Sequence, residues 1–394
     1  MGQTIRVSLP GYDALTDTNL DHYSLYADVD NVLIKRYSTG TDTVLVGGTN
    51  SYIHNLGYIP FFMVYASLNN DGNYSMINNQ VGALSFPPIV AYTDTGTLKV
   101  ENNSGAGTVP LGYDIFYDDM SQTGNPSITQ SKYAVKVTRP GKDTSSTNPN
   151  DYIMHSDLNN FKILKTGTVG LNLAGGLNSF NHGATVTTPY KYFVFSKFSD
   201  GKTAFIGGQV TSHSYDDSLI VGTSYMDSTK LYLAVSSGSG TATVSYIVYG
   251  AGTTGGNISD QSLVCTSAGY NALAETNPDN YNFHSGFQTL KYFQSGSLQM
   301  SNISSTTIGT IPHNLGYTPF FVVFAKTSDV GTGLYAIAPF YENRSTLFLP
   351  NKDIAAFCFA DSTNLYLKAW LDANANGTFT FNFYYKIFKN NLGL

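Results

Sequence analysis

The residues of this chain best suited to chemistry are two histidines, each placed in a polar turn before an apolar run. One turn is His54-Asn55-Leu56-Gly57-Tyr58-Ile59-Pro60, and the other is His313-Asn314-Leu315-Gly316-Tyr317-Thr318-Pro319. Histidine, asparagine and tyrosine side chains can all contact a polar ligand. A metal site is not expected, because no second ligand recurs at a fixed spacing. We expect both histidines to hydrogen-bond a loop, and the whole motif to be a structural turn that starts a buried strand.

Two sets of carboxylates could hold a cation. Residues 372–377 read Asp-x-Asn-x-Asn-Gly, the first half of a calcium loop, but Phe383 stands where the bidentate glutamate belongs. The second set consists of Asp17, Asp21, Asp28 and Asp30, with Glu275 and Asp279 near the corresponding places later in the chain. Carboxylates beside Asn and Thr usually form turns. We therefore expect turns at both places, with no metal and no cofactor.

Catalytic motifs are missing from the sequence. It contains no P-loop, no Gly-x-Ser-x-Gly elbow, no His-Glu-x-x-His and no Cys-x-x-Cys. Glycoside hydrolysis needs two carboxylates about 5 to 9.5 Å apart, and no spacing here indicates such a pair. We expect a protein that is not an enzyme. A polysaccharide depolymerase that uses Asp28 or Asp30 is the enzymatic alternative.

The composition is that of a β-rich protein with uncharged polar surfaces. Only 12% of the 394 residues are charged, against roughly 25% in an average domain, and there are 29 Tyr and 24 Phe. The net charge is −6 and no basic run exceeds two residues, which argues against nucleic-acid binding. Without a long apolar run or a basic-apolar leader, we expect neither membrane insertion nor a secretory signal. Exposed tyrosines would suit protein interfaces and sugar faces.

The two cysteines, Cys265 and Cys358, are too few for a disulfide framework. Both have apolar neighbours, which favours two free thiols. A single bridge between them is the alternative, since both fall in the last third of the chain.

The elements that would position these residues recur three times. The openings around Gly11, Gly141 and Gly269 share a glycine turn, a Thr-Asn pair and a tyrosine. Each opening leads to a half-apolar run that contains a lysine and reaches a further glycine. Those later glycines are Gly40, Gly167 and Gly296. Self-similarity of this kind indicates repeated structural units.

The units also close alike, with a short strand, a polar turn and a tyrosine-rich strand. The short strands are expected at 98–100, 231–233 and 365–367, and the tyrosine-rich strands at 113–117, 246–249 and 379–388. Alternating aromatic and β-branched runs between Gly, Asn, Asp and Ser turns are typical of strands. We predict an all-β fold of three tandem β-sandwich domains without long helices. Their expected boundaries are 1–122, 130–250 and 260–394.

The middle unit departs from the others at the histidine turn. Where they have His-Asn-Leu-Gly-Tyr, it has the run 186–195, Val-Thr-Thr-Pro-Tyr-Lys-Tyr-Phe-Val-Phe. The strand is kept, and the His-Asn-Leu-Gly part of the motif is missing. We interpret this as loss of the His-Asn-Leu-Gly turn from the middle unit, so any chemistry at His54 or His313 would be absent there.

These residues bear a resemblance to a known group of proteins. The Pro-Gly-Tyr-Asp/Asn-x-Leu opening at residues 10–15, followed by the "His-Asn-Leu-Gly-Tyr-x-Pro-Phe-Phe" strand, resembles repeats in virion structural proteins of tailed bacteriophages. The resemblance covers most of the first and third units and, more weakly, the second. It implies β-sandwiches that decorate capsids, tails or fibres, often as trimers, and it implies no catalytic residues.

The resemblance sets the functional expectation. We expect a non-enzymatic structural protein on the exterior of a phage particle, assembled in the host cytoplasm and localised to the virion. Its expected partners are other virion proteins and further copies of itself, with a trimer as one arrangement, and it would contact host-surface glycans as well. The alternative is a carbohydrate-binding adhesin or receptor-binding module that works alone.

Overall fold

The chain folds almost entirely into β-strands, which confirms the all-β prediction. The computed structural model describes residues 5–19, 22–26, 34–77, 89–103, 107–120, 128, 134–139, 141–172, 176–197, 201–205, 222–235, 241–250, 263–266, 269–271, 281–285, 289–327, 336–338, 340–343, 353–371 and 379–394. Over these residues it contains no α-helix, and a short 3₁₀ helix, η2, spans Pro149–Asp151.

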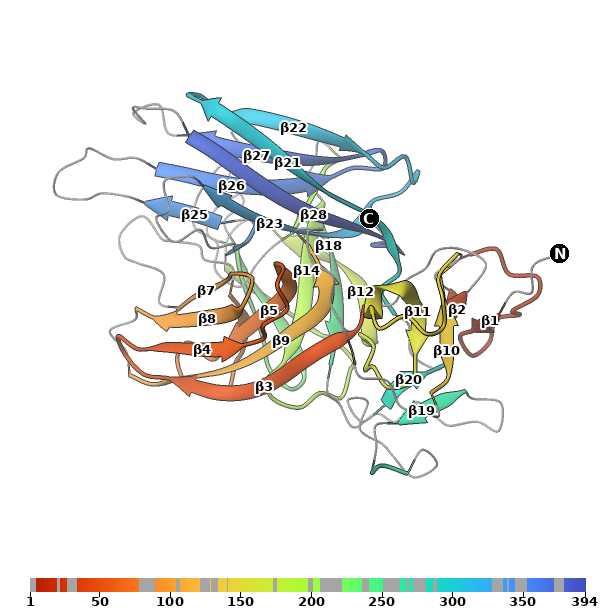
Figure 1. Ribbon diagram of the computed structural model, residues 1–394. Helices are drawn as coiled ribbons and strands as arrows, with labels where there is room; N and C mark the ends of the chain where they lie inside the picture. Colours follow the sequence, from red (N-terminus) through yellow and green to blue (C-terminus); the bar gives the residue numbers. More distant parts are fainter. Residues whose placement is uncertain are drawn as a thin grey trace.

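Each repeat begins with a small antiparallel ladder of two strands. The ladders pair β1 (Arg6–Ser8) with β2 (Tyr23–Tyr26), β10 (Lys136–Thr138) with β11 (Tyr152–His155), and β19 (Val264–Thr266) with β20 (Tyr281–His284). The three ladders lie together at one end of the molecule, beside the N-terminus (Figure 1). They share a small apolar core made of Leu25, Ile153, Met154 and Phe283. We call this end of the molecule the ladder end.

Each repeat continues with a larger sheet whose strand order is the same three times. In the first repeat the order is β3 (Arg36–Val44), β9 (Val109–Asp119), β5 (Pro60–Ala66) and β6 (Ser75–Met76). In the second it is β12 (Ile163–Asn172), β18 (Thr241–Tyr249), β14 (Lys191–Lys197) and β15 (Thr203–Phe205). In the third it is β21 (Tyr292–Ile303), β28 (Phe379–Asn391), β23 (Pro319–Thr327) and β24 (Ala336–Ile337).

A second set of antiparallel strands also recurs in each repeat. These strands are β4 (Thr49–Ile53), β8 (Thr97–Asn102) and β7 (Ile89–Thr93) in the first repeat, and β13 (Gly176–Asn181), β17 (Lys230–Val235) and β16 (Gly222–Met226) in the second. In the third they are β22 (Thr307–Pro312), β27 (Asn364–Leu371), β26 (Asp353–Ala360) and β25 (Phe340–Asn343). The predicted closing strands at 98–100, 231–233 and 365–367 are the centres of these sheets.

Burial differs between the two sets of strands for a physical reason. In β8 and β27 every second side chain is buried, as in a sheet with one face on the core and one in water. All seven residues of β5 are buried, so both faces of that strand are covered. The apolar run after each histidine turn is therefore a central strand that packs on two sides.

A glycine and a tyrosine face each other across the same two strands in every repeat. The pairs are Gly40 with Tyr113, Gly167 with Tyr246, and Gly296 with Tyr385. A Cβ added at Gly40 would lie 2.7 Å from the Tyr113 hydroxyl oxygen, and the tyrosine covers the other two glycines in the same way. Glycine is thus required because the aromatic ring lies over its backbone. These pairs confirm that the three glycines found in the sequence are equivalent positions.

The central strands β5, β14 and β23 can be aligned through those tyrosines, because Val64, Val194 and Val323 are their partners on the other side. In each repeat, the aromatic residue that directly follows this valine packs against the next repeat. Its partner there stands two positions before the valine of that repeat. The contacts are Tyr65 with Tyr192, 5.8 Å between ring centroids, Phe195 with Phe321, 5.4 Å, and Phe324 with Phe62, 5.1 Å. The first repeat contacts the second, the second the third, and the third the first. We call this arrangement the three-repeat circle.

Backbone pairing between repeats follows the same cyclic order. β15 pairs with β26 of the third repeat, which joins sheets of two repeats into one eight-stranded sheet. Tyr74, immediately before β6, exchanges two backbone hydrogen bonds of 2.9 Å with Met226 in β16. β24 lies against β7 of the first repeat. The predicted boundaries at 122–130 and 250–260 stay a prediction, because contacts between strands of different repeats do not test where one repeat ends along the chain.

A buried ion network also links the first repeat to the second. Asp114 in β9 lies 3.2 Å from Arg36 Nε and 2.8 Å from Lys191 Nζ, and the Asp114 side chain is fully buried. Lys191 stands where the third repeat has the apolar Phe320, which packs on Phe195. The second and third repeats therefore differ at this equivalent position, which is charged in one and apolar in the other.

Candidate functional site

The last repeat shows what the histidine turn does. The backbone N–H of His313 donates to the Thr363 carbonyl at 2.8 Å, and the Leu315 N–H donates to His313 Nδ1 at 3.2 Å. The other ring nitrogen, Nε2, lies 3.2 Å from the Asp361 carbonyl oxygen. Both ring nitrogens are therefore used inside the protein. His313 fastens its own turn to the neighbouring turn at 361–364.

The first repeat repeats this geometry. His54 is buried, its Nδ1 accepts from the Leu56 N–H at 3.2 Å, and its Nε2 lies 3.3 Å from Thr93 Oγ1. Left-handed backbone conformations occur at the expected positions, with φ of 49° at Asn55 and 77° at Gly57. Asparagine and glycine are the residues that tolerate this conformation. In the last repeat Asn314 and Gly316 do the same.

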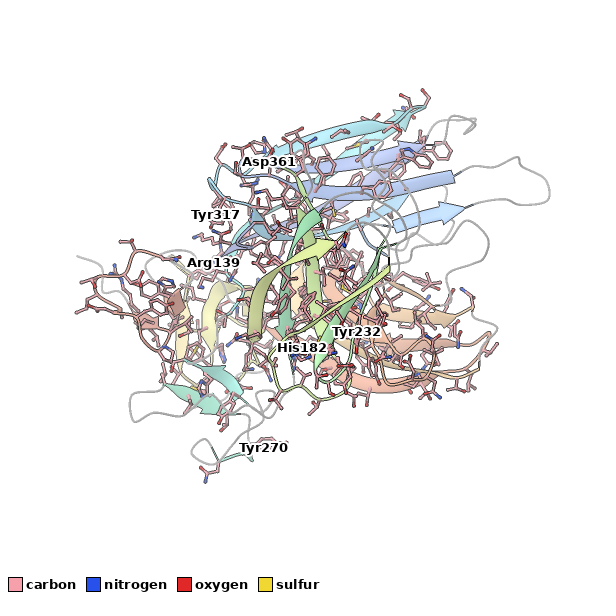
Figure 2. All side chains as sticks on the ribbon, turned by 180° about the vertical axis from the view of Figure 1, so that it is seen from behind. Arg139, His182, Tyr232, Tyr270, Tyr317 and Asp361 are labelled. Atoms are coloured by element: carbon pink, nitrogen blue, oxygen red, sulfur yellow. The ribbon has the colours of Figure 1, made fainter. Side chains whose placement is uncertain are left out.

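The interpretation that the middle repeat has lost this histidine is wrong. His182 is fully buried, its Nδ1 accepts from the Ala184 N–H at 3.1 Å, and its Nε2 lies 3.3 Å from the Asp227 carbonyl oxygen. Its backbone N–H donates to Thr229, as that of His313 does to Thr363. The sequence hid this because His182 stands one residue further from the following proline, Pro189, than His54 stands from Pro60. Figure 2 shows His182 beside Tyr232, the tyrosine whose hydroxyl donates to Asp227.

These three histidines predict how stability depends on pH. Burial lowers the pKa of His54, His182 and His313 below the ordinary value. Below about pH 6.5 the unfolded chain therefore binds more protons than the folded one, so the free energy of unfolding falls as the pH falls. We expect a lower urea midpoint at pH 5.5 than at 7.5, and a smaller difference in His182→Gln. An equal or higher midpoint at pH 5.5 would contradict this.

The tyrosines of the two motifs have different surroundings. Tyr58 is fully buried, whereas Tyr317 is partly exposed and donates its hydroxyl hydrogen to the Lys389 carbonyl at 2.5 Å. The prolines that follow, Pro60 and Pro319, are the first residues of β5 and β23. The structural reading of the turns therefore fits His54, His313 and both prolines, while Tyr317 has an accessible ring.

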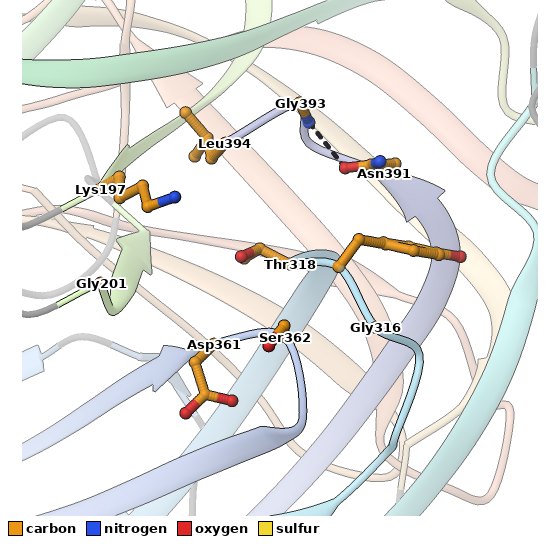
Figure 3. Close-up of a pocket in the computed structure, with 10 residues that line it drawn as sticks. Lys197, Gly201, Gly316, Thr318, Asp361, Ser362, Asn391, Gly393 and Leu394 are labelled. Carbon is orange, nitrogen blue, oxygen red and sulfur yellow. Dashed lines mark hydrogen bonds between the residues drawn. The ribbon is translucent and has the colours of Figure 1, made fainter.

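Tyr317 belongs to a polar cavity of about 430 Å³ at the junction of the second and third repeats. Its lining includes Lys197, Tyr317, Thr318, Asp361, Ser362 and Asn391. In Figure 3 the amino end of Lys197 and the hydroxyl of Thr318 are directed toward the same open space, and the Asp361 carboxylate points away from them. A smaller cavity of about 160 Å³ is lined by residues 390–393 together with residues of β12 and β18.

The charged side chains of Asp361 and Lys197 in the larger cavity differ in the hydrogen bonds that they make. Asp361 Oδ1 accepts backbone hydrogen bonds from Thr363 and Asn364 at 2.7 and 2.8 Å, and Oδ2 accepts from the Tyr366 hydroxyl at 2.8 Å. Burial raises the pKa of Asp361, but these hydrogen bonds outweigh it and the pKa is lowered. Its carboxylate is committed to the turn. Within the described part of the chain, Lys197 Nζ has no hydrogen-bond or ion-pair partner.

Other candidate residues are turn formers or lie outside the described residues. Asp17 accepts from the Asn19 N–H at 2.8 Å and pairs with His22 at 2.7 Å, as expected of a turn residue. Residues 372–377 and the carboxylates Asp21, Asp28, Asp30, Glu275 and Asp279 lie outside the described residues. Among the residues that the structure describes, no group of three potential ligands could hold a metal ion.

The two cysteines are free thiols, which confirms the favoured reading. Cys358 is buried and Cys265 is partly buried, and burial raises the pKa of the Cys265 thiol. Neither thiol is therefore activated. In the described ranges, no helix is long and apolar enough to cross a membrane.

The ladder end carries an exposed apolar residue at the same place in each repeat. Ile5, Val135 and Leu263 each stand immediately before the first ladder strand, and their exposed fractions are 49%, 54% and 41%. Each is two residues before a residue that packs on the ladder core, namely Val7, Val137 and Cys265. Each therefore stands at the same place relative to the ladder core of its repeat. We call them the apolar triad.

Sequence and structure comparisons with known proteins found no matching family model, no matching curated protein and no matching solved structure.

Proposed function

We propose that this chain is a non-enzymatic structural protein of a bacteriophage particle that acts through protein–protein surfaces on the particle exterior. The observation that carries the proposal is the three-repeat circle. It gives one chain the three-fold arrangement that the resembling virion proteins reach as trimers. The low charge of the chain, 12% of residues, also suits protein contacts better than contacts with nucleic acid.

We take each repeat to be a β-sandwich domain, with boundaries near 1–122, 130–250 and 260–394. The alternating burial of β8 and β27 supports this, since a sheet with one buried face needs a second layer to cover it. The role assigned to the chain places it in the virion after assembly in the host cytoplasm, as a decoration, collar, tail or fibre component. Further copies of the chain are proposed partners as well.

The surface that fits such a role best is the ladder end. Its apolar triad offers three similar side chains, Ile5, Val135 and Leu263, one from each repeat. We take these three side chains together as the interaction site, because a set that recurs in all three repeats fits a partner with three-fold symmetry. In Figure 2 Tyr270 projects at the same end of the molecule, and it is 49% exposed.

The experiment is electron microscopy of the purified phage particles whose genome encodes this chain, with an antibody against it. Label at a three-fold or six-fold position is expected, and particles without label would rule out the virion role. Particles grown with the triple variant Ile5→Asp, Val135→Asp and Leu263→Asp should lack the protein. Leu45→Asp is the control. It changes an exposed leucine that lies outside the ladders, directly after β3, and it should leave incorporation intact.

The second candidate is a carbohydrate-binding adhesin or receptor-binding module. The cavity at Tyr317 is the specific observation that favours it, because an aromatic ring, hydroxyls and an amide around a concave space are typical of ligand sites. The two functions are compatible in one protein on a particle surface. A glycan array with the full chain separates them, since a purely structural protein binds none of the glycans.

A further inference from the structure

We propose that strand β22 of the third repeat is a docking edge for a second copy of this chain, in which the β22 strands of two copies pair antiparallel across a two-fold axis. This inference rests on the proposed function in one respect: it names the surface by which the further copies proposed there as partners attach. An edge strand offers a row of backbone N–H and C=O groups to another chain, and pairing with them gives affinity through main-chain hydrogen bonds.

The fold itself shows what covers the opposite edge of each such sheet. In the second repeat, β16 exchanges backbone hydrogen bonds with Tyr74 of the first repeat. In the third repeat β26 pairs with β15 of the second, and in the first repeat β7 lies against β24 of the third. The other edges are β4, β13 and β22, and no further strand pairs with them in the described part of the chain. A strand of a like repeat is therefore the occupant that we infer for an open edge.

Two of the three outer edges are tied to their own repeat by an asparagine. Asn50 in β4 donates to the Thr43 carbonyl of β3 at 2.9 Å, and Asn178 in β13 donates to the Asn172 carbonyl of β12 at 3.2 Å. The pairing with the central strands β8, β17 and β27 places Gly309 of β22 at the same position. Glycine has no side chain that could make this hydrogen bond. The tie that β4 and β13 have is therefore missing from β22.

The outward side of β22 suits contact with a like strand. Its inward side is filled, because a Cβ added at Gly309 would lie 2.2 Å from Leu298 Cδ2 of β21. On the other face Ile308 is 52% exposed and Thr310 is exposed as well. Natural edge strands usually avoid pairing with like edges by carrying charges, above all lysine, whereas β22 reads Thr-Ile-Gly-Thr-Ile-Pro. Two such edges meet without repulsion, and β22 runs along the margin of the molecule at the top of Figure 1.

A two-fold axis through Gly309 matches the faces of the two strands. In this antiparallel register Ile308 lies opposite Thr310 of the partner subunit, and Thr307 lies opposite Ile311 of the partner subunit. Exposed side chains then meet on one face of the sheet and inward side chains on the other, whereas a shift of one residue would mix them. The pair extends the eight-stranded sheet that contains β22 into a sheet shared by two copies.

Sedimentation equilibrium of the full chain over a range of protein concentrations tests the inference. The mass of wild type should rise with concentration from 42.7 kDa toward twice that value. Ile308→Lys sets like charges from both copies along the paired edge and should raise the dimer dissociation constant about tenfold or more. The matched control is Leu177→Lys, because Leu177 holds the same register position in β13 and is 57% exposed. It should associate as wild type does, and thermal unfolding should show that both variants fold.

Hydrogen exchange locates the contact. Backbone amides that become hydrogen-bonded in the dimer exchange more slowly. Peptides that cover 307–312 should therefore exchange more slowly at high than at low protein concentration. Peptides that cover 176–181, in β13, should exchange at the same rate at both concentrations.

Three results would overturn the inference. They are a monomer at every concentration, association of Ile308→Lys as strong as that of wild type, and concentration-dependent protection at β4 or β13 in place of β22. None of these bears on the virion role, which the antibody labelling of particles decides independently. Conversely, unlabelled particles together with a dimer that depends on Ile308 would reject the virion role and keep the docking edge.

Discussion

Replacing Phe195 by alanine is expected to lower the free energy of unfolding by about 3–5 kcal/mol, the usual loss for a buried aromatic residue cut to alanine. The Phe195 ring is fully buried and lies 5.3 Å from Phe320 and 5.4 Å from Phe321, measured between ring centroids. Both partners belong to the third repeat. The substitution therefore leaves a cavity at a contact that closes the three-repeat circle.

Urea unfolding followed by the fluorescence of Trp370 measures this effect where it is most informative. Trp370 is the single tryptophan and lies in β27 of the third repeat, whereas Phe195 lies in the second. If the repeats unfold as one body, the Trp370 transition should move to lower urea in Phe195→Ala. Leu177→Ala, at a 57% exposed position of the second repeat, is the control and should change little. An unchanged Trp370 midpoint in Phe195→Ala would mean that the repeats unfold separately.

Replacing Asp114 by alanine is expected to have the second large effect, again a loss of about 3–5 kcal/mol in the free energy of unfolding. Asp114 lies within ion-pair distance of both Arg36 and Lys191, and both cations are buried. Removing it takes the shared carboxylate away from two buried positive charges, and such a loss costs more than the ion pairs contribute. Since Lys191 belongs to the second repeat, the damage falls on the junction with the first.

A triple variant separates the cost of unpaired charge from a packing defect. Asp114→Ala combined with Arg36→Met and Lys191→Met removes the charges together and should recover most of the lost stability in urea unfolding. An exposed pair gives the matched control: Lys142 is 47% exposed and lies 3.1 Å from Asp151, so Lys142→Ala should cost at most about 1 kcal/mol. The explanation fails if Asp114→Ala is no worse than Lys142→Ala.

A closed circle of repeats within one chain has a consequence that a homotrimer does not share. In a homotrimer every junction carries the same residues, whereas here each junction can differ. The Asp114 network occurs at the junction of the first and second repeats, and the cavity with Lys197 and Tyr317 at that of the second and third. Divergence of the repeats can thus change one junction without disturbing the other two.

Much of the fold could be predicted from the sequence, because its signals are local. Alternating apolar residues predicted strands such as β27 and β28, and the glycines at 40, 167 and 296 marked equivalent positions in the three repeats. The reason for those glycines, the facing tyrosines, was not evident, since strand partners lie far apart in sequence. The circle was also missed, because contacts such as that of Phe324 with Phe62 join the two ends of the chain and leave no local pattern.

The candidate site shows a different limit of prediction from sequence, because its features depend on neighbours that are distant along the chain. The two turns share the letters His-Asn-Leu-Gly-Tyr, yet Tyr58 is buried and Tyr317 lines a cavity, because different neighbours cover them. His182 escaped notice because one additional residue before the proline broke the alignment, although its hydrogen bonds match those of His54 and His313. Nothing in the local sequence of Lys197 distinguishes it from Lys326, its register equivalent in β23. Their difference lies in the repeat that each one faces.

The most direct test of the three-repeat circle is small-angle X-ray scattering of the monomer separated by size-exclusion chromatography. A compact chain of 394 residues should have a radius of gyration of about 21 Å. Three separate domains in a row would give a value on the order of 30 Å with an elongated distance distribution. A radius near 21 Å at a mass of 42.7 kDa is the predicted result, and a value near 30 Å at that mass would contradict the circle.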